Sequence, residues 1–542
     1  MEEHWFKQAI IYCLDVDTFQ DSNGDGIGDL VGLTRRLDYL ARLGVTCLWL
    51  NPVHPTPNRD DGYDVTDFYG VDPRLGTLGD FVELVHQAAN RGQRVIIDLV
   101  VNHTSDEHPW FQSARSSPES PHRDWYVWSA SEPVGIDDGV VFPGKQKTTW
   151  TYDDTAGAWY HHRFYDFQPD LNWSNPDVRA EVGKIVAFWL QLGVAGFRLD
   201  AAPFVIEDVH PDQSEFRREY SWLDELSAAA SWHKGDAILL AEANVKEKEL
   251  DEFFGDGRRV SMLFNFLLNQ RLFLSLARGS AAPLREALAA MMALPDQCTW
   301  ATFLRNHDEV DLSGLSESER QECFDAFGPK PEMQLYGRGI RRRLAPMLGD
   351  DRRQIELAYA LQVSLPGTPV LRYGEEIGMG DDLDQPERYS IRTPMQWSWA
   401  DNAGFSTCKP KQLVRPIATG DIGGYETTNV DAERADENSL LAWFERMLRT
   451  LRECPEFGAA SWEVLDGGDP RVLAMLYSQP TGQLLAISNL GPRKCEIDLA
   501  SELPDDITLV EMFSDRHYDQ DTGLDALSLA GHGYRWLRLV EQ

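Results

Sequence analysis

The sequence predicts an α/β protein built on a (β/α)8 TIM barrel, with an inserted subdomain after the third strand and a C-terminal antiparallel β domain. Short runs rich in β-branched and large apolar residues alternate with segments of helical periodicity. Several of these runs end in polar residues, as the strands of a catalytic barrel do. The predicted strands are Ala9–Val16, Val45–Pro52, Arg94–His103, Gly196–Ala202, Ala237–Asn244, Met262–Asn269, Trp300–Asp308 and Thr368–Glu376.

The segments between the first strands have the pattern of amphipathic helices. Between the first two strands, one apolar helix face is formed by Leu30, Leu33, Leu37 and Leu40. Gly44 follows at the position where glycine commonly ends a helix. Before the third strand, Asp80 is placed to cap a helix that ends near Gly92. This alternation of strand and helix predicts parallel barrel strands joined by crossover helices.

One long segment divides the barrel. Residues 104–172 are rich in Trp, Tyr, Ser, Pro and Asp, and they lack long helical periodicity. We therefore expect an inserted subdomain beside the barrel mouth. The barrel then consists of residues 1–103 and residues 173–460.

Two later segments also leave the barrel pattern. Residues 309–348 form a second long excursion, which is a candidate lid. Its basic stretch, residues 338–343, is interpreted most simply as a solvated helix face. Residues 461–542 alternate apolar and polar positions, with a turn at 480–483, and predict a small antiparallel β domain that contains a hairpin.

Composition limits the partners. A formal net charge of -36 argues against nucleic acid or an anionic membrane, whose phosphates would be repelled, but it permits a neutral polyol. The N-terminus lacks the basic and apolar regions of a secretory signal, and no apolar run is long enough to span a membrane. Seven scattered cysteines, with no CxxC pair, predict reduced thiols in a cytoplasmic protein.

Polar residues at the predicted strand ends should converge on one rim of the barrel. They are Asp60, Tyr63, Asn102, His103, Arg198, Asp200, Glu242, Asn244, His307 and Asp308. Cleavage of a glycosidic bond needs one carboxylate to attack or stabilise the sugar cation and one carboxylic acid to protonate the leaving oxygen. A single such residue arises easily by chance, whereas an ordered set at successive strand ends does not. We therefore predict an enzyme that cleaves and re-forms glycosidic bonds, with Asp200 and Glu242 as the paired carboxylates.

Four strand ends resemble, in order, the signature regions of the α-amylase superfamily of glycoside hydrolases. These are Asp98–His103, Gly196–Asp200, Leu240–Asn244 and Phe303–Asp308. The resemblance extends over essentially the whole chain and implies a retaining mechanism. By resemblance Asp200 is the nucleophile, Glu242 is the acid that becomes the base, and Asp308 strengthens transition-state binding.

The resemblance also implies a glucose-binding subsite −1. Its wall would be formed by Asp60, Tyr63, His103 and His307. Arg198 would hold Asp200 ionised by charge pairing, whereas Glu242 needs a raised pKa to arrive protonated. By the same resemblance, the block Asp60–Asp64, which contains Asp60 and Tyr63, favours exo-action on short oligosaccharides.

Within the superfamily, several stretches are most similar to members that interconvert maltose and trehalose. These stretches are residues 241–244, 303–309, 339–346 and 373–380. That similarity implies intramolecular α-glucosyl transfer in a closed, dry pocket, because water would hydrolyse the glucosyl-enzyme. Subsite +1 would be lined by Gln168, Asn244, Glu309 and Arg392. The sequence departs from the usual pattern around this subsite at residues 12–19, 201–204 and 384–390. The identity of the acceptor therefore stays open.

Two other functions stay open. An α-glucosidase or transglucosidase would use the same nucleophile on maltose, sucrose or short oligosaccharides, with water or another sugar as acceptor. A catalytically silent binding homologue is expected to have lost Asp200, Glu242 or Asp308, and all three are present. Under each hypothesis the partner is a small disaccharide or oligosaccharide, and a homo-oligomer remains open.

A second signal is a loop in which oxygen-bearing side chains alternate with glycines, as a hard cation requires. It begins like an EF-hand loop, but Gly32 stands where the twelfth-position Glu would be. The resemblance implies a structural Ca²⁺ site formed by Asp21, Asn23, Asp25, the carbonyl of Ile27 and Asp29. It also implies a second site formed by Asn102, Asp170, Glu207 and the carbonyls of Phe204 and Val205. The alternative for the first loop is an Asp/Asn/Gly turn without metal.

Overall fold

The computed structural model describes residues 4–214, 216–504, 507–518 and 523–541. Within these residues, eight parallel strands close into a barrel in the order β1-β16-β12-β11-β10-β7-β3-β2. They are β1 (Ile11–Leu14), β2 (Cys47–Leu50), β3 (Arg94–Leu99), β7 (Gly196–Leu199), β10 (Ile238–Ala241), β11 (Met262–Phe264), β12 (Thr299–Phe303) and β16 (Thr368–Arg372). Seven lie inside one predicted strand each, and β12 begins one residue before its predicted range, at Thr299, so the TIM barrel is confirmed. The predicted ranges extend into the loops because they include the polar residues that follow the strand ends, such as Glu242 and Asp308.

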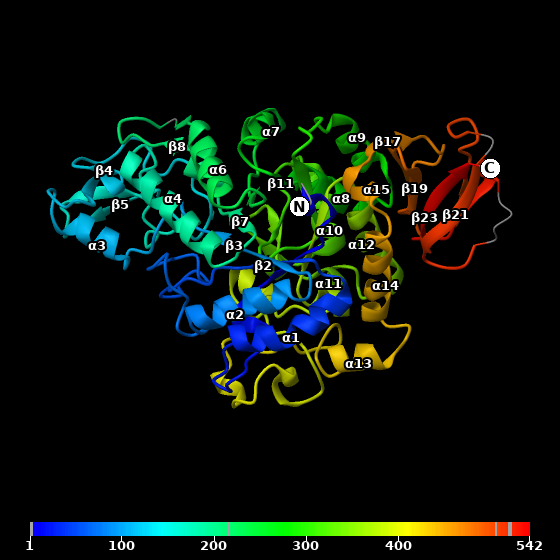
Figure 1. The fold of residues 1–542 in the computed structure, drawn as a ribbon, viewed down its shortest axis with the longest axis horizontal. Helices are drawn as coiled ribbons and strands as arrows, with labels where there is room; N and C mark the ends of the chain where they lie inside the picture. The colour runs from blue at the N-terminus through cyan, green and yellow to red at the C-terminus, as the bar shows by residue number, and fades with distance from the viewer. Residues whose placement is uncertain (1–3, 215, 505–506, 519–522, 542) are drawn as a thin grey trace.

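Helices surround the barrel (Figure 1). The main ones are α1 (Leu30–Leu43), α2 (Leu78–Ala89), α4 (Pro176–Gln191), α6 (Ser221–His233), α7 (Glu247–Phe254), α8 (Phe266–Arg278), α9 (Ala282–Ala290), α12 (Arg352–Ser364) and α14 (Leu440–Arg452). Gly44 ends α1 with a φ of 106°, a left-handed conformation that favours glycine. The prediction that Asp80 caps α2 is wrong by three residues. Thr77 is the N-cap, and Asp80 completes a capping box with it.

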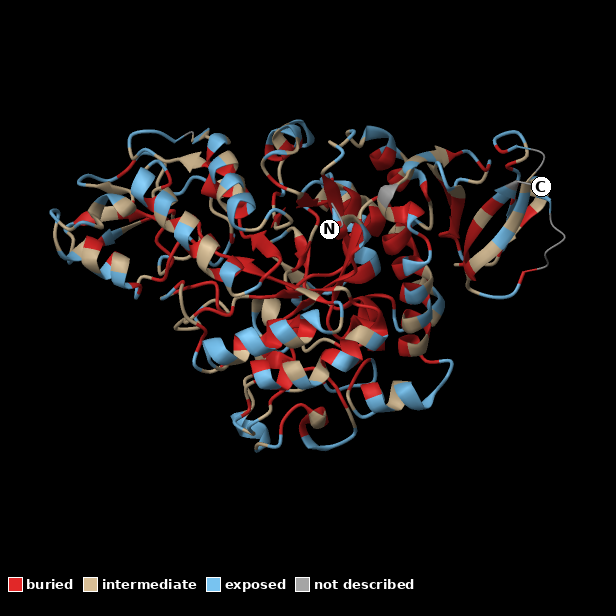
Figure 2. Cartoon of the chain, viewed as in Figure 1, coloured by how far each residue is buried: buried red, intermediate tan, exposed pale blue. Residues whose placement is uncertain are grey.

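The core has two layers. Side chains such as Ile11, Cys13 and Trp49 fill the barrel interior, whereas Tyr12 and Leu14 pack in the layer between the strands and the helices. This follows from the two-residue period of a strand, which sends successive side chains to opposite faces. Figure 2 shows buried residues along the strands and on the helix faces turned toward them.

The inserted subdomain lies at one side of the barrel (Figure 1). It contains α3 (Pro109–Ser116) and a sheet in the order β4-β6-β5. The strands are β4 (Trp128–Ser129), β5 (Trp150–Asp153) and β6 (Ala158–His161). Aromatic residues hold it together: the Phe111 ring stacks on Trp128, with centroids 5.6 Å apart.

The excursion at residues 309–348 forms α10 (Glu317–Phe327), α11 (Leu344–Met347) and a small sheet in the order β13-β15-β14. Its strands are β13 (Val310–Asp311), β14 (Gln334–Leu335) and β15 (Gly339–Ile340). The expected solvated helix at residues 338–343 is wrong. Arg343 is 1% exposed and pairs with Glu375, and buried Arg341 donates to the carbonyls of Leu383 and Gln385. Arg341 therefore anchors the loop that contains Leu383 and Gln385, and Arg343 is a buried cation paired with Glu375.

The C-terminal β domain contains a sheet in the order β17-β18-β19-β23-β21 and a pair formed by β20 and β22. The predicted hairpin is present as β18 (Val472–Gln479) and β19 (Gly482–Asn489). The other strands are β17 (Ser461–Leu465), β20 (Cys495–Ile497), β21 (Ile507–Ser514), β22 (Leu527–Leu529) and β23 (Tyr534–Glu541). None of the helices in the described ranges has the length and apolar character needed to cross a membrane.

Candidate active site

The carboxyl ends of the barrel strands surround a cavity of about 420 Å³. Its wall includes Asp200, Glu242 and Asp308, which follow β7, β10 and β12 respectively. This volume lies within the roughly 300–1,000 Å³ typical of small-molecule sites. The structure therefore brings the three predicted catalytic carboxylates into one cavity.

A single buried guanidinium connects the carboxylates. Arg198 is 1% exposed and donates from Nη1 to Asp98 Oδ1 at 3.0 Å and to Asp200 Oδ1 at 2.6 Å. From Nη2 it donates to Glu242 Oε2 at 2.5 Å. The strand register explains the cluster, because Asp98 of β3 and Leu240 of β10 both lie opposite Arg198. Three acidic groups thus share one buried cation, and of the three only Glu242 is substantially exposed, with 24% of its side chain accessible.

The pKa values of the carboxylate pair suit an acid and a nucleophile. Burial raises the pKa of Asp200 to about 6, although Arg198 acts in the opposite direction. Burial, reinforced by the charges of Asp200 and Asp308, raises the pKa of Glu242 to about 7 against the same arginine. We expected Arg198 to keep the pKa of Asp200 low, but desolvation outweighs the charge pairing. Glu242 is still the more readily protonated of the two, as a general acid must be.

Asp308 has the opposite environment. Burial alone would raise its pKa, but His307, Arg388 and Arg392 together hold it well below the ordinary range. Arg388 Nη1 lies 2.8 Å and Arg392 Nη2 lies 3.0 Å from Asp308 Oδ1. Burial lowers the pKa of His307 to about 4, so its imidazole is neutral. Asp308 is therefore a permanently ionised carboxylate, suited to stabilise positive charge that develops on a sugar ring.

The predicted wall of subsite −1 lines the cavity. Tyr63 Oη donates to Asp98 Oδ2 at 2.9 Å and contacts His307 Nε2 at 2.8 Å, and the two rings stack 5.5 Å apart. His103 is held against the Tyr63 carbonyl at 2.9 Å. Asp60 pairs with Arg388 at 3.1 Å. The aromatic and hydroxyl-binding groups of this wall are thus rigidly placed around Asp200.

The four residues predicted for subsite +1 divide into two pairs. Asn244 and Glu309 line the cavity, whereas Gln168 and Arg392 are absent from its lining in the described structure. Gln168 is fully buried and donates to Asp60 Oδ2 at 2.9 Å. Arg392 is 1% exposed and donates to the His307 carbonyl at 2.7 Å. Both side chains lie behind the cavity wall. Gln168 positions Asp60, and Arg392 positions Asp308.

Sequence reasoning missed Arg388. It lines the cavity and donates to both Asp60 and Asp308, and its guanidinium lies 5.0 Å from the Phe142 ring centroid. It lies in the irregular segment 384–390 and not at a strand end, so the strand-end argument could not find it. The departure from the superfamily pattern in that segment was the available signal.

Three distant segments meet above this wall in a cluster that we call the Glu387 clasp. Glu387 Oε2 accepts hydrogen bonds from Tyr165 Oη and Tyr336 Oη, each at 2.9 Å, and Lys145 Nζ lies 3.3 Å from Oε1. The Phe142 ring packs between the two tyrosines, with centroid distances of 5.0 and 5.1 Å. The clasp joins the inserted subdomain to the 309–348 excursion and to the loop that carries Arg388.

The 21–29 loop has a donor set that fits a hard cation. Asp21 Oδ1 accepts the N–H groups of Asn23 and Gly24, and Asn23 Oδ1 accepts that of Asp25, which curls the oxygen-bearing side chains around the loop. The described residues hold no group of three His, Cys, Asp or Glu side chains that could bind a metal unaided. The amide and carbonyl oxygens of the loop would therefore be needed as ligands.

Protein donors surround the side chains of the second predicted metal set. The Arg163 guanidinium pairs with Glu207, and the Arg163 N–H donates to Asp170 Oδ2 at 3.0 Å. Asn102 Nδ2 donates to Asp170 Oδ1 at 3.0 Å, and His161 Nδ1 lies 3.1 Å from Asp170 Oδ2. Protein donors thus contact the side-chain oxygens of Asp170 and Glu207. The second Ca²⁺ site, formed by Asn102, Asp170, Glu207 and the carbonyls of Phe204 and Val205, stays a prediction.

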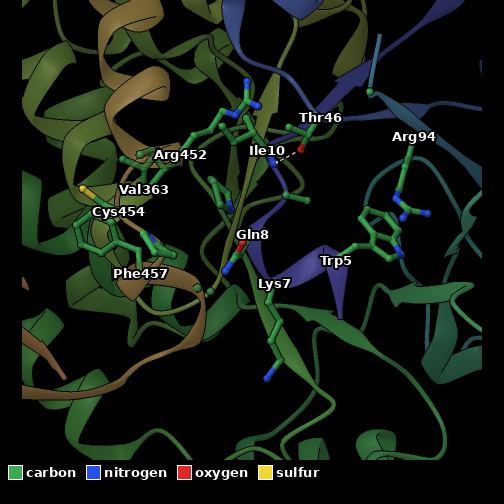
Figure 3. A pocket seen from close by; sticks show the side chains of 17 residues that line it. Trp5, Lys7, Gln8, Ile10, Thr46, Arg94, Val363, Arg452, Cys454 and Phe457 are labelled. Atoms are coloured by element: carbon green, nitrogen blue, oxygen red, sulfur yellow. Dashed lines mark hydrogen bonds between the residues drawn. The ribbon is translucent and has the colours of Figure 1, made fainter. Parts of the chain in front are cut away.

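Another cavity, of about 340 Å³, lies at the amino ends of β1, β2 and β3 (Figure 3). Figure 3 shows Trp5, Lys7, Arg94 and Phe457 around it. Its described lining contains no carboxylate, so it lacks the acid and the nucleophile of a glycosidase.

The family model described as "Alpha amylase, catalytic domain" matches residues 13–325 and 340–457. The chain belongs to the α-amylase family. A relative in this family, the "Trehalose synthase/amylase TreS" of Mycolicibacterium smegmatis, is 41% identical over 100% of this chain and 93% of its own length. The "Glucan 1,6-alpha-glucosidase" of Streptococcus pneumoniae is 32% identical over 93% and 94% of the two chains.

A solved structure agrees with the family assignment. The α-amylase of H. orenii superposes with a TM-score of 0.79 at 28% identity, covering 100% of both chains. Together with the three carboxylates gathered in the cavity, the family membership identifies the protein as an enzyme that acts on sugars.

Proposed function

We propose that this enzyme interconverts maltose and trehalose by intramolecular transfer of an α-glucosyl unit. The observation that carries the proposal is the Glu387 clasp, which holds Phe142 and the Arg388 loop at the wall of the cavity that contains Asp200 and Glu242. A closed cavity favours transfer over hydrolysis, because a glucosyl-enzyme that meets water is lost as glucose. The 41% identity to a trehalose synthase/amylase over the full chain supports the same activity.

The reaction follows from the roles of the carboxylates. Asp200 attacks the anomeric carbon of the non-reducing glucose of maltose, while Glu242 gives its proton to the leaving 4-oxygen. A β-glucosyl-Asp200 ester and a free glucose result. Glu242, now ionised, removes the proton from the anomeric hydroxyl of that glucose, whose oxygen attacks the anomeric carbon of the glucosyl unit and displaces the Asp200 carboxylate. Trehalose forms, and Asp200 and the protonated Glu242 are restored.

The acceptor side must retain the glucose while it turns. Asn244 and Glu309 line this side, and burial raises the pKa of Glu309 to about 7. A carboxyl group near half-protonation both donates and accepts hydrogen bonds, which suits an acceptor that presents different hydroxyls in turn. Arg338, 3.6 Å from Glu309, fixes this group at the cavity wall.

We also propose that the loop of Asp21, Asn23, Asp25, Ile27 and Asp29 binds a structural Ca²⁺ ion. The ion would supply a hard charge that draws the loop oxygens together. It would lie outside the sugar cavity, since none of these residues lines it in the described structure.

We further propose that the enzyme works in the cytoplasm, because the seven cysteines in the described ranges are free.

The test is to incubate the enzyme separately with maltose, trehalose and sucrose and to identify the products. Trehalose from maltose with little free glucose is expected. Glucose alone would overturn the proposal in favour of an α-glucosidase, the second candidate, which the 32% identity to a glucan glucosidase supports.

A further inference from the structure

The carboxylate of Asp308 is held by two arginines, and each arginine is shared with a second carboxylate. Arg388 donates to Asp308 and to Asp60, and all three line the active-site cavity. Arg392 donates to Asp308 Oδ1 at 3.0 Å and to Asp61 Oδ2 at 2.6 Å. Asp61 is absent from the described lining of that cavity. Asp61 is therefore linked to Asp308 through Arg392.

A tight turn sends the neighbouring side chains of Asp60 and Asp61 to different sides of the cavity wall. The Tyr63 N–H donates to the Asp60 carbonyl at 2.9 Å and closes the turn. Its two central residues, Asp61 and Gly62, have positive φ angles of 53° and 94°. Asp and Gly are among the few residues that adopt such a backbone readily. The turn thus places one carboxylate in the cavity and the next one behind its wall.

Asp61 lies between two cations. Its side chain is 5% exposed, and it accepts hydrogen bonds from Arg392 and from Arg415, which is 7% exposed. Arg415 also donates to the Arg392 carbonyl at 3.2 Å and lies 3.6 Å from Asp17. Burial alone would raise the pKa of Asp61, but Arg415 and Arg392 hold it well below its ordinary range. Asp61 is therefore a fixed negative charge between two guanidinium groups.

The charge of Asp61 determines how strongly the charge of Arg392 acts on Asp308. A guanidinium shared between two carboxylates neutralises each of them less than one with a single carboxylate partner. Asp308 has to keep its negative charge for the sugar, because positive charge develops on the ring in the transition state. Without an anion at residue 61, the charges of Arg392 and Arg415 would both act on Asp308 unbalanced.

We propose that Asp61 is a positioning residue for the transfer of the glucosyl unit. It orients Arg392 and offsets its charge, so that Asp308 stays available to the cationic transition state. The inference rests on the proposed α-glucosyl transfer, but not on the identity of the acceptor. The effect of Asp61 is expected in kcat and not in KM, because the sugar carries no charge in the ground state.

Two variants separate the charge of Asp61 from its place in the packing. Asp61→Asn keeps the size of the side chain, and we expect kcat for maltose to fall about tenfold with KM changed by less than about twofold. Adding Arg415→Gln removes the cation that is left without an anion, so the double variant should recover about threefold in kcat. An unchanged kcat in Asp61→Asn, or a double variant slower than the single one, overturns the proposal.

The matched control is a buried ion pair far from the cavity lining. In the C-terminal sheet, Arg535 is paired with Glu511 at 2.6 Å, and its side chain is 5% exposed. Glu511→Gln removes a carboxylate from a buried arginine just as Asp61→Asn does, and it should leave kcat for maltose unchanged. An equal fall of kcat in Glu511→Gln would mean that the loss of any buried ion pair slows the enzyme, which also overturns the proposal.

A binding measurement separates this inference from the proposed reaction. In the full-length enzyme, Asp61→Asn should weaken binding of 1-deoxynojirimycin, a glucose analogue with a basic ring nitrogen, about tenfold and leave the affinity for glucose unchanged. Calorimetry measures both affinities. Equal losses for the two ligands, or no loss for either, overturn the role of Asp61, whatever products the wild-type enzyme makes. A loss selective for the amine, in an enzyme that forms no trehalose, overturns only the isomerase assignment.

The double variant provides the same test if Asp61→Asn does not fold. Asp61→Asn with Arg415→Gln removes one buried charge of each sign, so no unpaired cation is left behind the wall. Its affinity for 1-deoxynojirimycin should still fall about threefold relative to the wild-type enzyme, because Arg392 is no longer shared. Its affinity for glucose should stay unchanged, and an equal fall for both ligands would overturn the proposal.

Discussion

The two ends of the active-site cavity are built differently. At the glucosyl end, Asp98, Arg198 and Asp200 lie on or directly after barrel strands and are buried together. At the acceptor end, Tyr165, Tyr336 and Glu387 come from three irregular segments far apart in the sequence. A closed barrel fixes the first group through its register, whereas only side-chain contacts between loops fix the second.

This structural difference between the two ends indicates which end controls the rate of bond cleavage and which end controls the choice of acceptor. Bond cleavage needs a rigid acid–nucleophile geometry, which strands provide. Retention or release of the leaving sugar depends on whether the loops stay closed, and loops open at lower cost than barrel strands. Substitutions at the glucosyl end should therefore affect the rate, and substitutions at the acceptor end should affect the products.

The largest expected effect is at the glucosyl end. Asp200→Asn should reduce kcat by about 10⁴-fold or more, because no ester can form. Glu242→Gln should reduce it by about 10²–10⁴-fold, the usual contribution of a general acid–base group. Initial rates of trehalose formation from maltose measure both changes. Circular dichroism should remain unchanged, and a variant with a tenth of wild-type activity would contradict the assigned roles.

Most of the glucosyl end could be predicted from sequence, because strand ends in a parallel barrel share one rim. Asp200, Glu242 and Asp308 each follow a recognisable apolar run, and the barrel brings them together. The pKa of Asp200 was the exception. Its rise to about 6 depends on how completely the folded chain excludes water, and no local pattern in the sequence encodes that.

The acceptor end could not be predicted in the same way. Arg388 and Glu387 lie in a loop whose path is set by contacts with residues 309–348, such as those of buried Arg341. A basic run in the sequence does not distinguish such a buried anchor from a solvated helix face. Gln168 and Arg392 were assigned to the correct neighbourhood, but only the packing shows that they lie behind the wall.

The dependence of kcat/KM on pH tests which groups titrate at the glucosyl end. The nucleophile must be ionised, so kcat/KM should rise with pH as Asp200 loses its proton near pH 6. The acid must be protonated, so kcat/KM should fall as Glu242 loses its proton near pH 7. The expected profile is a narrow bell between these values. In Glu242→Gln, the residual activity should keep the acidic limb and lose the alkaline one, and a retained alkaline limb would assign that titration to another group.

The Glu387 clasp is the test of the acceptor end. Tyr165→Phe with Tyr336→Phe removes both hydroxyl donors to Glu387, each a hydrogen bond to a charged group worth about 1.5–3 kcal/mol. We expect the free glucose formed per trehalose to rise about tenfold, with consumption of maltose nearly unchanged. Chromatography of the products measures the ratio. Tyr152→Phe, at a tyrosine that is 47% exposed, is the matched control, and an unchanged ratio in the double variant would show that the clasp does not retain the sugar.

The smallest expected effect comes from the 21–29 loop, which belongs to neither end. Asp21 accepts a hydrogen bond from Ser406, and the neighbouring Gln20 donates to the Phe405 carbonyl, so the loop is attached to the 404–412 segment and not to the cavity. Chelation of calcium should lower the unfolding midpoint by about 2–5 °C, because a bound ion stabilises only the folded state. Asp21→Ala should remove the response to added calcium. The ratio of free glucose to trehalose should stay constant in both experiments. The 21–29 loop is not attached to the cavity, so a change in its stability does not open the Glu387 clasp. A change in that ratio on chelation would instead place the loop among the elements that keep the acceptor end closed.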